Sequence, residues 1–160
     1  MGAGHMRGVV IGTVFAVLAA AGFWFVLGQG TTENASAAPV DIAEGKALYA
    51  ENCASCHGAE LEGQPDWRSP GPDGRLPAPP HNETGHTWHH PDSVLFDYTK
   101  LGGEALMAQR GMEFGSGMPG FGDSLTDQQI RNILGYIRST WPEDVKQAQA
   151  ERTKADNGAN

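Results

Sequence analysis

Apolar and polar positions follow a helical period most clearly in the last third of the chain. Apolar residues recur there at i, i+3, i+4, i+7 and i+11, namely Ile130, Ile133, Leu134, Ile137 and Trp141. Thr126 and Gln129 just before them have the spacing of a capping box. The pattern predicts a helix with one buried face that begins after Thr126 and loses that face at Pro142.

Residues 41–53 form a second helix candidate. Ile42, Gly45 and Tyr49 fall at i, i+3 and i+7, and Asp41 is a suitable N-cap. A glycine in the middle of a helix costs stability and usually marks close packing. We therefore expect another element to lie against Gly45.

The region between these two helices has two loops and two shorter helices. Residues 63–91 contain 11 Gly or Pro among 29 positions, a density that predicts a long loop. Residues 91–101 read as a helix, with Val94, Leu95, Tyr98 and Leu101 on one side and Gly102-Gly103 as its stop. Residues 104–110 predict a short helix, and residues 111–122, with five glycines, predict a loop. No convincing strand is present, so the fold class is all-α.

The two ends of the chain differ from this central part. Residues 8–27 are apolar, Gly or Thr after the single charge of Arg7, and 20 residues are enough to cross a hydrocarbon core of about 30 Å. Residues 1–27 are therefore predicted to be a membrane anchor with its N-terminus inside, although the small triplet 35–37 also permits signal-peptide cleavage. Residues 28–40 read as a flexible linker and residues 142–160 as a polar tail, frayed or disordered. The folded domain is predicted to span residues 41–141.

The charge limits the partners of this domain. A formal net charge of −8 argues against nucleic acid, because phosphate binding needs a basic surface. An acidic surface can meet a basic patch on a partner protein, or it can simply keep the protein soluble. Both interpretations remain open from the sequence.

The two cysteines carry the chemistry. Cys53-Ala54-Ser55-Cys56-His57 fits the C-x-x-C-H pattern of c-type haem attachment. Two thiols at this spacing can add to the two vinyl groups on one haem edge, and the adjacent imidazole can bind the iron. A thioredoxin-like dithiol would need a βαβ context, and a zinc site would need a second ligand pair. The motif therefore predicts one covalent haem c, with His57 as an iron ligand.

A methionine is the candidate for the other axial position. Met118-Pro119 lies in a glycine-rich loop, where glycines let the backbone approach a flat ring closely. A thioether ligand would raise the reduction potential. Met118 could instead be a buried gap-filler. Met107, which we place in the core, and Met112 are the competitors.

These motifs together resemble a class I monohaem cytochrome c over residues 41–141, of the membrane-anchored or exported bacterial type. The matching features are Gly45-x-x-x-Tyr49 before the attachment motif, Met118-Pro119-x-Phe121, and the last helix with Ile133, Tyr136 and Trp141. The resemblance implies crossed N- and C-terminal helices around one haem. It also implies that Gly45 and Tyr49 pack at this crossing against Ile133 and Tyr136.

The same resemblance suggests roles in the long loop. A backbone carbonyl there would accept the second ring N–H of His57, and Pro77 is our choice for it. Arg68 and Arg75 are candidates to hold the haem propionates through charge-assisted hydrogen bonds; the alternative is that they are ordinary surface arginines.

Four more histidines cluster in this loop: His81, His86, His89 and His90. They can be surface and turn residues, a second metal site for copper or zinc, or groups that affect the haem or partner docking. The sequence leaves these three interpretations open.

The function expected from the sequence is one-electron transfer between redox protein partners, without enzymatic activity. A His/Met site has no open position, so it carries electrons instead of activating oxygen. The haem domain would face the periplasm from a bacterial inner membrane, or be soluble there if the N-terminal segment is removed. The alternatives are a dedicated subunit of a periplasmic dehydrogenase or oxidase, a cytochrome whose His-rich loop handles copper, and a haem sensor.

Overall fold

The computed structural model describes residue 1 and residues 38–159. The predicted anchor or signal segment at residues 1–27, the cleavage triplet and most of the predicted linker lie outside these residues. Within the described part, no helix combines the length and the apolar character needed to cross a bilayer.

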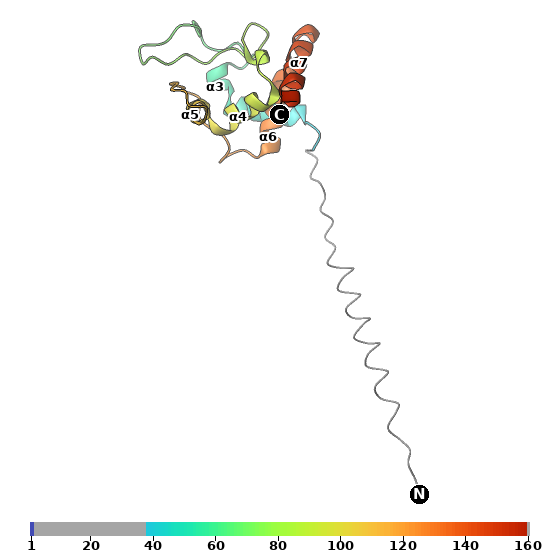
Figure 1. Cartoon of the computed structure of the whole chain (residues 1–160). Coiled ribbons are helices and arrows are strands. Elements are labelled where there is room, and N and C mark those ends of the chain that lie inside the picture. Colours follow the sequence, from blue (N-terminus) through green and yellow to red (C-terminus); the bar gives the residue numbers. More distant parts are fainter. Residues whose placement is uncertain (2–37, 160) are drawn as a thin grey trace. The chain divides into compact units, whose positions relative to one another are not determined.

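Residues 38–159 form six α-helices, a single 3₁₀ turn and no strand, which confirms the predicted all-α class. Figure 1 shows their arrangement, and its labels are used from here on. The elements are α2 (Ile42–Asn52), α3 (Ala54–His57), η1 (Thr87–His89), α4 (Asp92–Leu101), α5 (Gly103–Gln109), α6 (Asp127–Ser139) and α7 (Glu143–Ala159).

The first and last helices of the predicted domain begin as the sequence indicated. At α2, the Asp41 carboxylate accepts hydrogen bonds from Ala43 N at 2.9 Å and Glu44 N at 3.0 Å. At α6, Thr126 and Gln129 form the capping box: Thr126 N donates to Gln129 Oε1 at 2.9 Å, and the Thr126 hydroxyl accepts from Gln129 N at 3.3 Å. These caps satisfy backbone donors that a helix leaves unpaired in its first turn.

Helices α2 and α6 cross at Gly45. The backbone of Asn132 and Ile133 lies where a side chain on residue 45 would be, so only glycine permits this approach. Tyr49, 1% exposed, meets the ring of Tyr136 with centroids 5.5 Å apart. The packing of Gly45 and Tyr49 against α6 is therefore confirmed.

A polar contact fixes the same crossing. Asn132 is 1% exposed; its side-chain oxygen accepts from Asp41 N at 3.0 Å, and its amide donates to the Glu44 carboxylate. Because these partners lie at the start of α2, they set the register of one helix on the other.

The hydrophobic core gathers the apolar stripe of α6 with side chains from α2 and the loops. Its buried members are Tyr49, Leu61, Leu125, Ile130, Ile133, Ile137 and Trp141. Leu134, expected in the stripe, is only partly buried and packs against this core. Trp141 Nε1 donates to His81 O at 2.7 Å, so the last core residue also holds the long loop.

Helices α4 and α5 turn at two glycines. Gly102 has φ +85°, a conformation that favours glycine, and ends α4 as predicted. The apolar side of α4 is less buried than expected: Leu101 is 37% exposed, and Thr99 is the buried residue of this helix. In α5 the core position belongs to Leu106, 3% exposed, whereas Met107 is only half-buried; the placement of Met107 in the core was therefore wrong.

The predicted loop at residues 63–91 is irregular apart from the short turn η1. Gln64 and Ala78 close it with two hydrogen bonds: Gln64 N donates to Ala78 O and Ala78 N to Gln64 Oε1, both at 2.8 Å. The residues between them form an extended loop that projects away from the helices (Figure 1).

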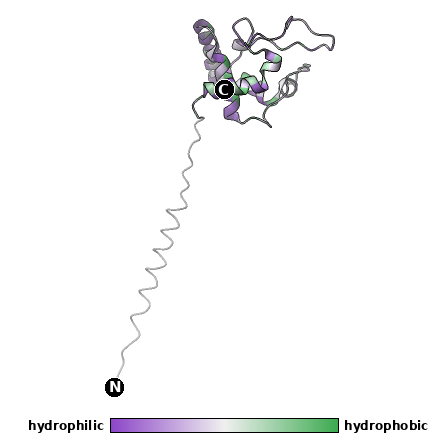
Figure 2. Ribbon diagram, turned by 180° about the vertical axis from the view of Figure 1, so that it is seen from behind, coloured by the Kyte–Doolittle hydropathy of each residue, from purple (hydrophilic) through white to green (hydrophobic). Residues whose placement is uncertain are grey.

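The predicted disorder or fraying of residues 142–160 is wrong. Residues 143–159 form α7, which packs on η1 and touches α4. Gln149, 1% exposed, anchors this helix: its Nε2 lies 2.7 Å from Asp92 Oδ1, 3.1 Å from Thr153 Oγ1 and 3.3 Å from His90 O. The surface of α7 is otherwise mostly hydrophilic (Figure 2). Hydrogen bonds from Asp92 N to Thr153 Oγ1 and from Ser93 Oγ to Asp156 Oδ2 add to this anchor, and Val145 packs against the core. Hydrophobic periodicity does not detect a helix that is held mainly by polar contacts.

The close approach at Gly45 leads to a first prediction. Gly45→Ala forces a methyl group into the Asn132 backbone, and we expect it to destabilise the protein by about 1–3 kcal/mol, as overpacking does. Gly158→Ala is the matched control, because nothing lies within 4 Å of the added methyl there. Chemical denaturation of both haem-loaded variants measures the difference. Equal stabilities would contradict the proposed contact.

The anchor at Gln149 leads to a second prediction. Gln149→Ala leaves Asp92 and Thr153 without their buried donor, and we expect a loss of about 1–3 kcal/mol in the free energy of unfolding. Gln147→Ala, at an exposed position of the same helix, should stay within about 0.5 kcal/mol of the parent. Similar denaturation midpoints for the two variants would show that α7 is not held at Gln149.

Candidate functional site

The two cysteines lie where α2 passes into α3. Cys53 is the C-cap of α2, with its N–H donating to Tyr49 O at 2.9 Å, and also the residue from which α3 begins. Hydrogen bonds from Cys56 N at 3.1 Å and His57 N at 2.9 Å both end on Cys53 O. One helical turn therefore carries both cysteines and the histidine. Neither cysteine is in a disulfide; Cys56 is exposed and Cys53 half-buried.

The His57 ring is buried, with 7% of its surface exposed. Its Nδ1 lies 2.8 Å from Pro79 O. A carbonyl oxygen only accepts, so Nδ1 carries the ring proton and Nε2 keeps its lone pair. Burial lowers the pKa of His57, although the hydrogen bond to Pro79 opposes this shift. The imidazole is neutral at neutral pH, the form that binds a metal.

The carbonyl predicted for this hydrogen bond was the wrong one. Pro77 was expected, and Pro79 takes the role. Two glycines determine which proline carbonyl reaches His57. Gly63, with φ +70°, packs against Pro79 and Pro80, and Gly85 packs against Pro80 O. Gly63 N also donates to His57 O at 2.7 Å. These contacts determine how closely the loop approaches His57. The number of residues between His57 and each proline therefore did not identify the carbonyl.

Two further groups stabilise the start of this site. The Tyr49 hydroxyl donates to Gly58 O at 2.8 Å, which ties α2 to the residue after His57. Burial raises the pKa of Tyr49 well above its usual range, so the hydroxyl remains a donor. Burial, followed by the nearby Cys56, raises the pKa of the Cys53 thiol to about 11.

Met118 lies on a different element, in the loop between α5 and α6. Its carbonyl accepts from Gly103 N at 3.2 Å, and its N–H donates to Ser116 Oγ at 3.2 Å. The backbone of residues 118–120 packs so closely on Gly102 that a side chain there would clash. Met118 is half-buried and borders a hollow of about 580 Å³, together with Arg75, Leu101 and Ser116.

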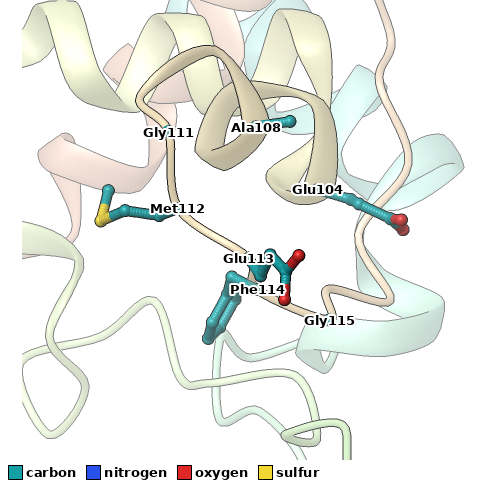
Figure 3. A pocket seen from close by; sticks show the side chains of 7 residues that line it. All are labelled: Glu104, Ala108, Gly111, Met112, Glu113, Phe114 and Gly115. Atoms are coloured by element: carbon teal, nitrogen blue, oxygen red, sulfur yellow. The ribbon is translucent and has the colours of Figure 1, made fainter.

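The competing methionines lie elsewhere. Met112 is 49% exposed and projects from the segment after α5, next to Glu113 and Phe114 (Figure 3). These side chains, with Glu104 and Ala108 of α5, border a second hollow. Met107 is half-buried within α5. Only Met118 of the three is fixed through its own backbone to the α4–α5 turn.

The two candidate arginines have different surroundings. Arg75 borders the hollow next to Met118, and its Cγ lies 3.8 Å from the position a side chain on Gly115 would take. Arg68 lies over the Trp67 ring, with its guanidinium carbon 4.0 Å from the ring centroid. Arg75 and Met118 therefore line the same hollow, and Arg68 is not among its lining residues.

The four loop histidines make different ring contacts. His81 stacks on His57 and His86 on Trp67, whereas the His89 ring lies tilted against Trp88. His90 meets His86 in a T-shaped contact with centroids 5.5 Å apart. Burial, and then the neighbouring His57, hold the pKa of His81 well below its usual range. Among the described residues, no group of three or more His, Cys, Asp or Glu could hold a metal ion.

Comparison with protein families identifies the architecture. A family model described as Cytochrome c matches residues 42–141, well over half of the chain. The chain belongs to the cytochrome c family. No curated protein and no solved structure matches it.

Membership of the cytochrome c family confirms the resemblance read from the sequence and the expectation of a covalent c-type haem. The site residues fit this cofactor: Cys53 and Cys56 lie on one helical turn and are not joined in a disulfide, and His57 offers a neutral, oriented imidazole. The matched region ends at Trp141, so α7 is an addition to the family domain.

Sequence reasoning missed two residues at this site. Pro79 could have been weighed equally with Pro77, because residues 77–80 contain three prolines. His81 was one of four histidines that could affect the haem, and the sequence did not distinguish it from the other three; in the structure it is the one that stacks on His57.

The packing at Pro80 leads to a third prediction. Gly85→Ala pushes against Pro80 O, and we expect it to displace the neighbouring Pro79 carbonyl from His57. The Nδ1–H proton of His57, slow to exchange with solvent in the parent, should then exchange faster in NMR spectra. The control Gly71→Ala meets only Asp73 Oδ1 at 3.3 Å and Arg75 O at 3.6 Å in the same loop. Unchanged exchange in Gly85→Ala would contradict this support.

Proposed function

We propose that this cytochrome is a one-electron carrier with His57 and Met118 as axial ligands, which exchanges electrons with redox protein partners. The bound haem supplies the one-electron couple. The observation that carries the proposal is the hydrogen bond from His57 Nδ1 to Pro79 O at 2.8 Å, because it fixes the tautomer that leaves Nε2 free to bind iron. The same bond makes the imidazole a stronger electron donor to a metal.

Met118 completes this proposal because its backbone is fixed. Its carbonyl is bound by Gly103 N, and Pro119 restricts the conformation of the residue before it. Tight packing of residues 118–120 on Gly102 limits the movement of the loop. A ligand held in this way needs little reorganisation when the iron changes its oxidation state. Two protein ligands also leave no open position for oxygen, which favours electron transfer over catalysis.

Arg75 is the better candidate to hold a propionate. It borders the same hollow as Met118, whereas Arg68 is engaged with the face of Trp67. A guanidinium next to a carboxylate forms a charge-assisted hydrogen bond and stabilises the anionic group. We therefore assign this role to Arg75 and leave Arg68 as a loop-stabilising residue.

We also propose that the haem domain works on the exported side of a membrane. Support comes from the apolar segment at residues 8–27, which follows Arg7. A retained anchor would keep the domain close to membrane partners, whereas cleavage would release it to the periplasm. The intact mass of the mature protein tests the anchor: loss of the first 37 residues would exclude it.

A dedicated subunit of a dehydrogenase or oxidase is the second candidate, and α7 is the observation that favours it. This helix extends the family domain and presents a polar outer surface that a fixed partner could use. Purification from the native membrane distinguishes the two, since a carrier is isolated alone and a subunit with its enzyme.

The assignment of Met118 leads to a fourth prediction. Met118→Ala should lower the midpoint potential by on the order of 0.1 V, because a thioether ligand favours the reduced state within the ~0.8 V range that axial ligands span. The open position should also let the reduced protein bind carbon monoxide. Redox titration and carbon monoxide difference spectra measure both effects.

Met107→Ala and Met112→Ala are the controls for this experiment. Both remove a thioether from the same half of the domain, and neither should change the potential or carbon monoxide binding substantially. If one of them reproduces the effect expected for Met118→Ala, the ligand has been assigned to the wrong methionine.

A further inference from the structure

His81 stacks directly on the ring of His57. The two ring centroids are 4.0 Å apart and the planes differ by 22°. At this separation the two imidazole rings are in stacking contact. The rings of Tyr49 and His81 meet in a T-shaped arrangement, with their centroids 6.3 Å apart and an interplanar angle of 72°. His81 is therefore placed between the candidate ligand and the hydrophobic core.

The backbone of His81 is fixed on both sides. Its N–H donates to Leu61 O at 2.8 Å, and its carbonyl accepts from Trp141 Nε1 at 2.7 Å. Leu61 and Trp141 are both buried at 3% exposure. These bonds connect the loop to the core, so the Cα of residue 81 has little freedom.

The ring of His81 is oriented by Thr87. Its Nδ1 lies 2.8 Å from Thr87 Oγ1, and Thr87 is 6% exposed in η1. The same hydroxyl lies 3.5 Å from Pro80 O. Helix α7 packs on η1, and Gln149 Nε2 reaches His90 O next to it. Helix α7 therefore packs on the 3₁₀ turn that contains Thr87, the hydrogen-bond partner of the His81 ring.

The hydrogen bond to Pro79 leaves the ring of His57 free to rotate about one axis. A single bond at Nδ1 fixes the direction of the N–H but lets the ring plane rock about that direction. A flat group against the ring face removes this freedom. We propose that His81 is a positioning residue that fixes the ring plane of His57 and shields it from water, with Thr87 holding His81 in place. This inference rests on the proposed function in taking His57 as the axial ligand.

A filler residue would give a different result from a positioning residue. Any apolar side chain of similar volume could fill the space beside His57, but only a flat ring in a fixed orientation sets the plane of the imidazole. That plane determines the asymmetry of the unpaired electron density around a ferric haem. The pattern of haem methyl shifts in the NMR spectrum therefore reports ring orientation separately from stability.

The test compares four haem-loaded variants: His81→Ala, His81→Phe, Thr87→Val and the control His89→Ala. His81→Ala should change the spread of the haem methyl shifts and lower the midpoint potential, because water near the ligand stabilises the ferric state. His81→Phe keeps a flat ring, so it should retain most of the parental pattern. Thr87→Val should give a smaller change in the direction of His81→Ala. His89, which is exposed and lies tilted against Trp88, should leave both readouts at parental values.

The proposal is overturned if His81→Ala keeps the parental methyl pattern and potential, even with reduced stability. It is also overturned if His81→Phe changes the pattern as much as His81→Ala does, because a stacked ring would then not be the constraint. If His81→Ala fails to retain haem, the other two variants still test the proposal. His81→Phe should keep most of the parental methyl pattern, and Thr87→Val should change it. A parental spectrum without an imidazole ligand would instead refute His57 and the proposed function, a result visible before any variant is made.

Discussion

The hydrogen bond between His57 and Pro79 joins two segments that lie 22 residues apart, and the arrangement of the loop between them follows from it. The carbonyl can reach a buried ring only if the loop folds back against α3. Gly63 and Gly85 make this possible, because side chains at either position would collide with residues 79–80. The bond also determines the chemistry, since the tautomer it selects is the one with a free lone pair at Nε2.

A second constraint acts on the helices that carry this loop. The crossing of α2 and α6 at Gly45 sets where α2 ends, and α2 ends at Cys53. The Tyr49 hydroxyl extends the constraint to Gly58, one residue past His57. The turn that carries Cys53, Cys56 and His57 is thus held before it by the helix crossing at Gly45 and after it by the hydrogen bond to Gly58. The cost of glycine in a helix is offset by the close contact it allows.

How much the sequence predicts depends on whether a feature is local. The capping box at Thr126 and the stop at Gly102 are local, and both helix boundaries were predicted within a residue or two. The carbonyl partner of His57 depends on long-range packing, so Pro77 was chosen where Pro79 is used. Helix α7 was mistaken for a tail, because hydrogen bonds of polar residues such as Gln149 and Thr153 hold it, and it has no continuous apolar stripe.

The loop histidines show again that contacts set by long-range packing cannot be read from the sequence. In the sequence His81 and His86 are equivalent, two imidazoles in one proline-rich loop. In the fold their surroundings differ. Hydrogen bonds to Trp141 and Thr87 hold His81 next to His57, whereas His86 is exposed and stacks on Trp67. Thr87 belongs to η1, on which the C-terminal helix packs. An element outside the matched family region is therefore in contact with the turn that orients His81, the ring stacked on His57.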